Sequence, residues 1–103
     1  MDTLKDKLET VISSYAGEAL NGFSYLTHNA DRDVFTIVSV GEVRGERVVD
    51  MGLVVRVVNG KIIIEHDVND KTLVDALVQA GIPRSQIVLA YAGEPVEETA
   101  NTP

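Results

Sequence analysis

The chain has 103 residues, of which 45% are hydrophobic, and this length and apolar content predict one domain folded around its own core. It contains no cysteine, which excludes disulfides, thiolate zinc sites, iron–sulfur clusters and cysteine nucleophiles. The 16 acidic and 9 basic residues give a formal charge of −7, a field that repels nucleic-acid phosphates and disfavours direct nucleic-acid binding.

The first segment predicts an amphipathic helix over residues 3–16. Its apolar side chains recur at the helical period and form one stripe: Leu4, Leu8, Val11, Ile12 and Tyr15. Asp2 or Thr3 can cap its start, and Gly17 can end it in a left-handed conformation. Charges in this segment leave no signal-peptide core, and no apolar run approaches the ~20 residues that span a bilayer, so a soluble, cytoplasmic protein without membrane contact is expected.

Residues 23–66 predict four strands joined by turn-forming clusters, over 23–28, 34–40, 47–58 and 61–66. Alternation in the third strand predicts one apolar face, made of Val49, Met51, Leu53, Val55 and Val57. The other face then carries Asp50, Gly52 and Arg56. Asn59-Gly60 is a strong hairpin signal, because a type I′ turn requires positive φ at both central residues.

A second helix follows, capped by Asn69 or Asp70 and ended by Gly81, and its buried stripe comprises Leu73, Ala76, Leu77 and Ala80. Residues 87–91 are almost wholly apolar and predict a short buried strand, joined to the fourth strand by a crossover. The predicted fold class is α+β: an N-terminal helix, a four-stranded antiparallel meander, a second helix and a final short strand. Residues 1–93 form the domain, and 94–103 form an acidic, loosely ordered C-terminal tail.

The densest polar segment, residues 65–70, holds three carboxylates and an imidazole. It lacks the glycine and distal glutamate of a calcium loop, so a strand end followed by a helix cap is the favoured interpretation. No cofactor and no metal site is predicted. An alternative is a small metal-dependent hydrolase or nuclease that uses Glu65, His66 and Asp67.

Two stretches of the C-terminal half, residues 59–67 and 77–94, resemble the XisI family, the fdxN-element excision controlling factors of cyanobacteria and some other bacteria. The most diagnostic part is Ala80-Gly81-Ile82-Pro83 followed by Gln86-Ile87-Val88-Leu89. The similarity also takes in the N-terminal helix and residues 33–41. It therefore covers nearly the whole chain in order and spacing.

The resemblance implies a non-catalytic accessory or regulatory protein that contributes to programmed DNA excision by a separate recombinase, together with a nuclease-like partner of the XisH type. A homodimer is also expected, because a meander leaves edge strands that invite pairing. The expected partner-binding surface comprises Asp50, Arg56, Glu65, His66, Asp67, Ile82, Pro83 and Arg84. The hydrolase or nuclease and a direct DNA-binding module remain the alternatives.

Overall fold

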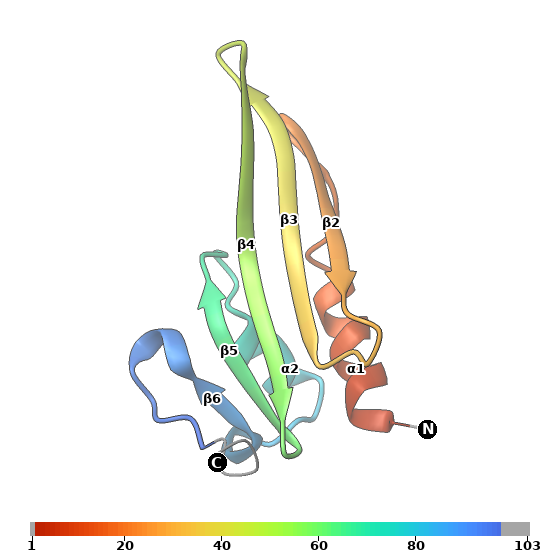
Figure 1. Ribbon diagram of the computed structural model, residues 1–103, viewed down its shortest axis with the longest axis vertical. Helices are drawn as coiled ribbons and strands as arrows, with labels where there is room; N and C mark the ends of the chain where they lie inside the picture. Colours follow the sequence, from red (N-terminus) through yellow and green to blue (C-terminus); the bar gives the residue numbers. More distant parts are fainter. Residues whose placement is uncertain (1, 98–103) are drawn as a thin grey trace.

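The computed structural model describes residues 2–97, which form one sheet with two α-helices on one of its faces (Figure 1). The helices are α1 (Thr3–Ser13) and α2 (Leu73–Gln79), with short 3-10 helices η1 (Arg84–Gln86) and η2 (Ala90–Ala92). The strands are β1 (Gly17–Ala19), β2 (Gly22–His28), β3 (Val34–Val43), β4 (Glu46–Val58), β5 (Lys61–Asp67) and β6 (Ile87–Leu89). The sheet runs in the order of the sequence, from β1 to β6.

The first helix forms where its apolar stripe predicts, with Asp2 as its N-cap accepting from the backbone N–H of Lys5 at 3.1 Å. It ends at Ser13, three residues before the expected end. The hydroxyls of Ser13 and Ser14 donate to carbonyls of the preceding turn, and the chain then tightens into i→i+3 bonds. Leu8 and Ile12 are fully buried, so the helix packs on the sheet through the centre of its stripe.

The expected four-stranded meander has a fifth strand in the described residues, because Gly17–Ala19 pairs antiparallel with the start of β2. Its three residues are too few to show a strand period. The final strand, β6, pairs parallel with β5, with Ile63 opposite Val88. A parallel pair requires a crossover, which α2 supplies as predicted.

Two hairpins of the sheet close with two-residue loops in which both residues have positive φ. The predicted type I′ turn at Asn59-Gly60 has φ values of 52° and 78°. Arg44-Gly45, between β3 and β4, has φ values of 54° and 81°. Both loops therefore match the twist of the strands they connect.

A β-bulge at Gly52 reverses the side-chain alternation of β4, and this corrects the face predicted from the sequence. Ile37 lies opposite Leu53, but the next residue of β3, Val38, lies opposite Met51. Gly52 is therefore the unpaired extra residue. Leu53 faces the helices, whereas Met51 lies on the other face with Val38. We call the face turned away from α1 and α2 the open face.

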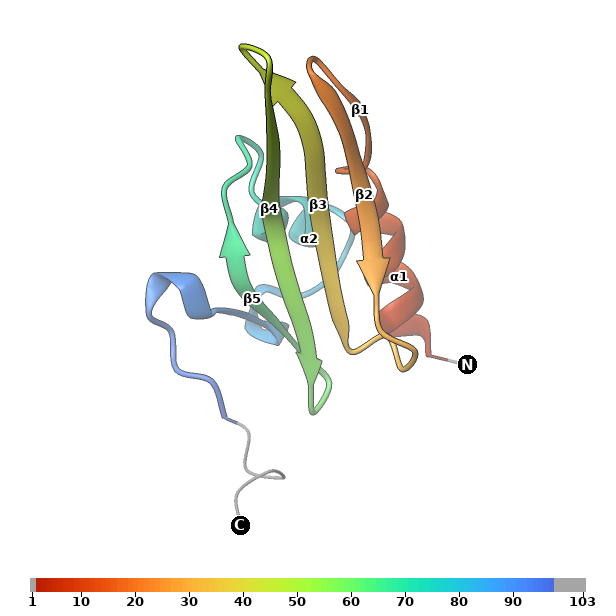
Figure 2. The same ribbon diagram turned by 45° about the horizontal axis from the view of Figure 1, so that its top comes forward.

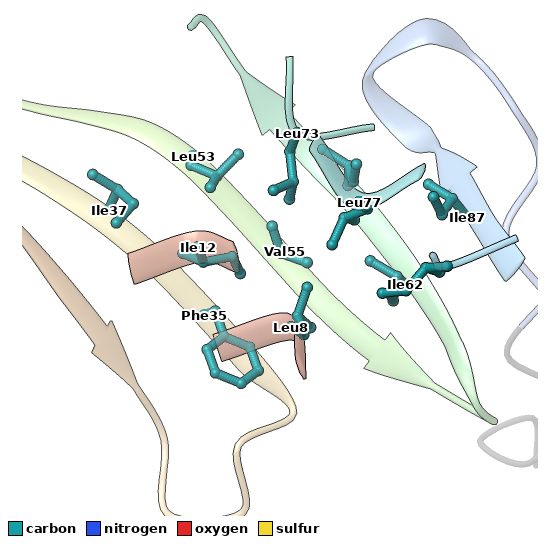
Figure 3. Packing of buried hydrophobic residues seen from close by; sticks show 12 residues of the cluster. Leu8, Ile12, Phe35, Ile37, Leu53, Val55, Ile62, Leu73, Leu77 and Ile87 are labelled. Carbon is teal, nitrogen blue, oxygen red and sulfur yellow. The ribbon is translucent and has the colours of Figure 1, made fainter. Parts of the chain in front are cut away.

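The core lies between the two helices and the half of the sheet that they cover (Figure 3). Its members are Leu8, Ile12, Phe35, Ile37, Leu53, Val55, Ile62, Ile64, Leu73, Leu77, Ile82 and Ile87. The hydroxyl of Tyr15 joins the two helical segments by donating to the carbonyl of Lys71 at 2.8 Å. Burial, followed by the charge of Asp67, raises the pKa of Tyr15 above its ordinary value. We call this helix-covered half the body.

The far ends of β2, β3 and β4 extend beyond both helices and beyond β5 (Figures 1 and 2). We call this part, residues 17–25 and 38–51, the arm. Every residue from Glu42 to Met51 is exposed, in contrast to the alternating burial of β4 after its bulge. The arm is thus a sheet with no helix on either face.

Candidate docking surface

The eight residues of the expected partner-binding surface do not converge on one patch. Ile82 is 4% exposed and belongs to the core, so its side chain is not available to a partner. Pro83 is exposed and is the N-cap of η1. Arg56 and Glu65 form an ion pair on the open face, with Nε and Oε2 2.8 Å apart. The remaining members, Asp50, His66, Asp67 and Arg84, each bind backbone groups.

The N-cap of the second helix is Thr72, which makes no side-chain cap hydrogen bond, and Asp67 supplies the acceptor in its place; this corrects the expectation that Asn69 or Asp70 caps the helix. Its Oδ2 accepts from the N–H of Leu73 at 2.7 Å, and its Oδ1 accepts from the N–H of Asn69 at 3.0 Å. Asn69 in turn donates through Nδ2 to the carbonyl of Gly52 at 3.0 Å. A second bulge makes this possible, because Glu65 is the extra residue between Ile64 and His66 and turns Asp67 toward α2.

Asp50 and His66 engage the outer edge of β4 at the foot of the arm. The N–H of Met51 donates to Oδ1 of Asp50 at 2.9 Å, and Nε2 of His66 lies 3.1 Å from the carbonyl oxygen of Met51. These contacts satisfy backbone groups that an edge strand otherwise leaves open to pairing. In this geometry, both side chains therefore bind backbone groups of Met51.

Glu65, His66 and Asp67 thus point to three separate partners rather than toward a common point. Within residues 2–97, no group of three or more histidine, cysteine, aspartate or glutamate side chains is placed to hold a metal ion. The structure therefore gives the hydrolase alternative no arrangement from which a metal-assisted step can be derived.

Arg84 is engaged by the C-terminal segment that follows β6. Glu94 accepts from the backbone N–H of Leu89 and from Nη2 of Arg84, each at 2.8 Å. The backbone hydrogen bond first, and the guanidinium second, hold the pKa of Glu94 below its ordinary value. The described part of the expected tail is therefore anchored at Glu94, while residues 98–103 lie outside the described residues.

The exposed apolar side chains gather on the arm, a feature that the sequence did not reveal. Of ten large hydrophobic residues exposed in the described part of the chain, seven lie on the arm: Leu20, Phe23, Tyr25, Val43, Val48, Val49 and Met51. The other three, Val68, Val78 and Tyr91, are scattered over the body. A concentrated patch of this kind marks an interaction surface, whereas scattered residues do not.

On the open face of the arm, six apolar residues share one side of three neighbouring strands. Val38 and Val40 of β3 lie between the two flanking strands, with Tyr25 opposite Val38 and Val49 opposite Val40. The rings of Phe23 and Tyr25 touch, with centroids 4.8 Å apart. We call this set the arm patch: Phe23, Tyr25, Val38, Val40, Val49 and Met51.

The face of the arm on the helix side carries a shallow groove of about 300 Å³. Its floor lacks side chains at Gly22 and Gly41, because a Cβ on Gly22 would lie 2.0 Å from the carbonyl oxygen of Val40. We call it the arm groove; its lining includes Leu20, Val43, Val48 and Asp50. Among these residues the only charged side chain is acidic, that of Asp50, which lies on the helix side opposite Ser39. The groove therefore suits a ligand that is apolar with basic flanks.

Comparisons with known proteins agree with this architecture. A family model described as XisI protein matches residues 1–101. A XisI-like protein from Anabaena variabilis is 23% identical, with a TM-score of 0.64 over 84% of this chain and 78% of that one. The fdxN element excision controlling factor XisI from the same organism is 23% identical, with a TM-score of 0.65 over 96% of this chain and 95% of that one. No curated protein matches.

No helix within residues 2–97 is long and apolar enough to cross a membrane. The two solved structures support the fold, with its two helices and mixed sheet. The family model extends the sequence similarity over almost the full length. The expected family is confirmed: this chain belongs to the XisI family.

Proposed function

We propose that this chain is a non-catalytic accessory protein that acts by binding a nuclease-like protein partner of the XisH type. A regulatory role agrees with the name of the solved relative, an fdxN element excision controlling factor. The observation that carries the proposal is the arm, which gathers most of the exposed apolar side chains of the described chain. A protein that works through recognition needs such a surface, and an enzyme needs a convergent polar site.

The arm groove is the docking site we assign to this partner. Leu20, at the tip between β1 and β2, is 99% exposed and has no contact that explains its apolar side chain. The carboxylate of Asp50 lines the groove, and the chain as a whole carries a charge of −7. A partner segment with one large aliphatic side chain between lysines or arginines matches both features.

The distribution of arginines favours a protein partner over direct contact with DNA. Arg32 pairs with Asp6 at 2.8 Å and with Glu9 at 2.9 Å, and Arg84 pairs with Glu94 at 2.8 Å. Guanidinium groups held by carboxylates contribute little net charge to a phosphate contact. Any influence on DNA is therefore exerted through the partner that touches it.

Co-expression with an XisH-type protein, followed by titration calorimetry, tests the proposal. The wild-type pair is expected to co-purify, and Val48→Asp with Leu20→Ser is expected to weaken binding at least tenfold, because anchor side chains carry most of an interface's affinity. The matched control is Val68→Asp, which changes a valine on the body that is more exposed than Val48. Failure to bind, or equal binding by the groove variant, contradicts the proposal.

A further inference from the structure

We infer that a second copy of this chain covers the arm patch, so that two molecules pair through their open faces about a two-fold axis. This inference does not depend on the proposed partner, which is assigned to the opposite side of the arm. The position, size and charge of the arm patch support this inference.

The arm patch is the uncovered part of a face that the chain otherwise covers itself. On the body, Ile63 points to the open face and is only 1% exposed, in a small pocket lined also by Val88, Pro95 and Glu97. On the arm, no described segment performs this role, and Met51 and Val49 are 47% and 66% exposed. The open face is therefore covered at Ile63 on the body and uncovered on the arm.

The area of the patch fits a modest dimer. An aromatic side chain buries about 150–250 Å² when fully covered, and Phe23 and Tyr25 keep 40% and 50% of their surface exposed. With Val49 and Met51, which are 66% and 47% exposed, the patch offers on the order of 400 Å². A standard interface buries about 800 Å² on each partner. The remainder can come from polar neighbours on the same face, such as Thr27 and Thr36. An apolar centre with a polar rim results, as in typical interfaces.

The charge of the patch selects a second copy rather than a basic partner. Two molecules of charge −7 repel one another, but Glu42 and Arg47 lie directly opposite each other at the rim of the patch and cancel. In the inferred dimer the two-fold axis runs between β3 and β4, which brings Glu42 of each copy toward Arg47 of the other. Glu18, opposite Phe23, adds one further carboxylate to the rim, so the rim carries two carboxylates and one guanidinium and attracts a basic partner only weakly.

The free edge of β4 is a less favourable route to the same dimer. The two-residue hairpin turns the N–H and C=O groups of Arg47 and Val49 outward, toward the side where β5 does not reach. In the register that pairs Arg47 of one copy with Val49 of the other, Glu46 lies opposite Asp50 of the second copy. Like charges directly across a strand pair are destabilising, so the geometry points to the face.

Sedimentation velocity over a concentration series of the full-length chain tests this inference. The wild type is expected to form a dimer, and Val49→Lys is expected to raise the dissociation constant at least tenfold, because it places a charge in the apolar centre. The matched control is Val68→Lys, at a valine that is 63% exposed on the body, which should leave the constant unchanged. Circular dichroism verifies that both variants fold.

A charge exchange provides a second, independent test of the dimer. Glu42→Arg is expected to weaken the dimer, and the double variant Glu42→Arg with Arg47→Glu is expected to restore it, since the exchange keeps opposite charges across the axis. The groove variant Leu20→Ser should dimerise as the wild type does, which separates this inference from the proposed partner. A wild type that stays monomeric at high concentration, or a Val49→Lys variant that dimerises normally, overturns it.

Discussion

Leu53 and Met51 lie two residues apart on β4, yet Leu53 is fully buried and Met51 is 47% exposed. The Gly52 bulge separates them and marks the boundary between the body and the arm. On the body, both helices and the C-terminal segment cover the sheet, and polar groups are engaged internally. On the arm, the same strands continue without cover. The comparison shows that one strand can be part of the buried core in one half and lie exposed in the other.

The largest expected effect tests whether the body alone carries the stability. Leu53→Ala should lower the free energy of unfolding by about 2–5 kcal/mol, because it leaves a cavity between the helices and the sheet. Met51→Ala should change it by less than about 0.5 kcal/mol, as is typical of exposed sites. Urea unfolding at one low protein concentration measures both. A large loss from Met51→Ala would remove the distinction between the two regions.

Two aspartates that accept from backbone N–H groups sharpen the comparison. Asp67→Ala removes the cap of α2 and should cost about 1–2 kcal/mol, because the N–H of Leu73 loses its acceptor beside the core. Asp50→Ala frees only the N–H of Met51, which water can reach, and should cost less than about 0.5 kcal/mol. Thermal unfolding compares the two variants. Equal losses would mean that the arm is as tightly integrated as the body.

The sequence predicted those elements whose signal is local. The apolar stripe of α1, the Asn59-Gly60 turn and the crossover to β6 each follow from residues close together in the chain. The Gly52 bulge depends on how β4 meets β3, and a single glycine in a strand indicates a bulge only once the register is known. The face containing Met51 was therefore predicted on the wrong side.

The expected docking residues show a similar limit of prediction from sequence. A sequence gives the charge of Asp67 but not the direction of its side chain, which the bulge at Glu65 turns toward α2. The conservative interpretation of residues 65–70 as a strand end and helix cap was correct in kind, although Asp67 accepts from Leu73 in place of the predicted caps. The arm patch could not be predicted, because burial of Val49 depends on where the helices end.

The smallest expected effect concerns the contact that anchors the C-terminal segment on the body. In the folded chain, the hydrogen bonds from the backbone N–H of Leu89 and from Arg84 favour the charged form of Glu94 over the protonated form. They hold the pKa of Glu94 below the ordinary value of 4.5. Its contribution to stability is therefore present above that value and is lost as the pH falls through the lowered pKa. Glu94→Gln should consequently lower the melting temperature near neutral pH, and the difference from wild type should shrink on acidification.

Melting temperatures of wild type and Glu94→Gln, measured from pH 7 down to about pH 3, reveal this dependence. Glu18→Gln on β1 is the control for the loss of one exposed carboxylate, and Glu94→Gln should show the larger change with pH. A difference from wild type that does not change with pH for Glu94→Gln would mean that the carboxylate charge does not hold the segment. Apolar packing would then hold the C-terminal segment over Ile63. The body and the arm would differ at this face only in whether apolar contacts cover it.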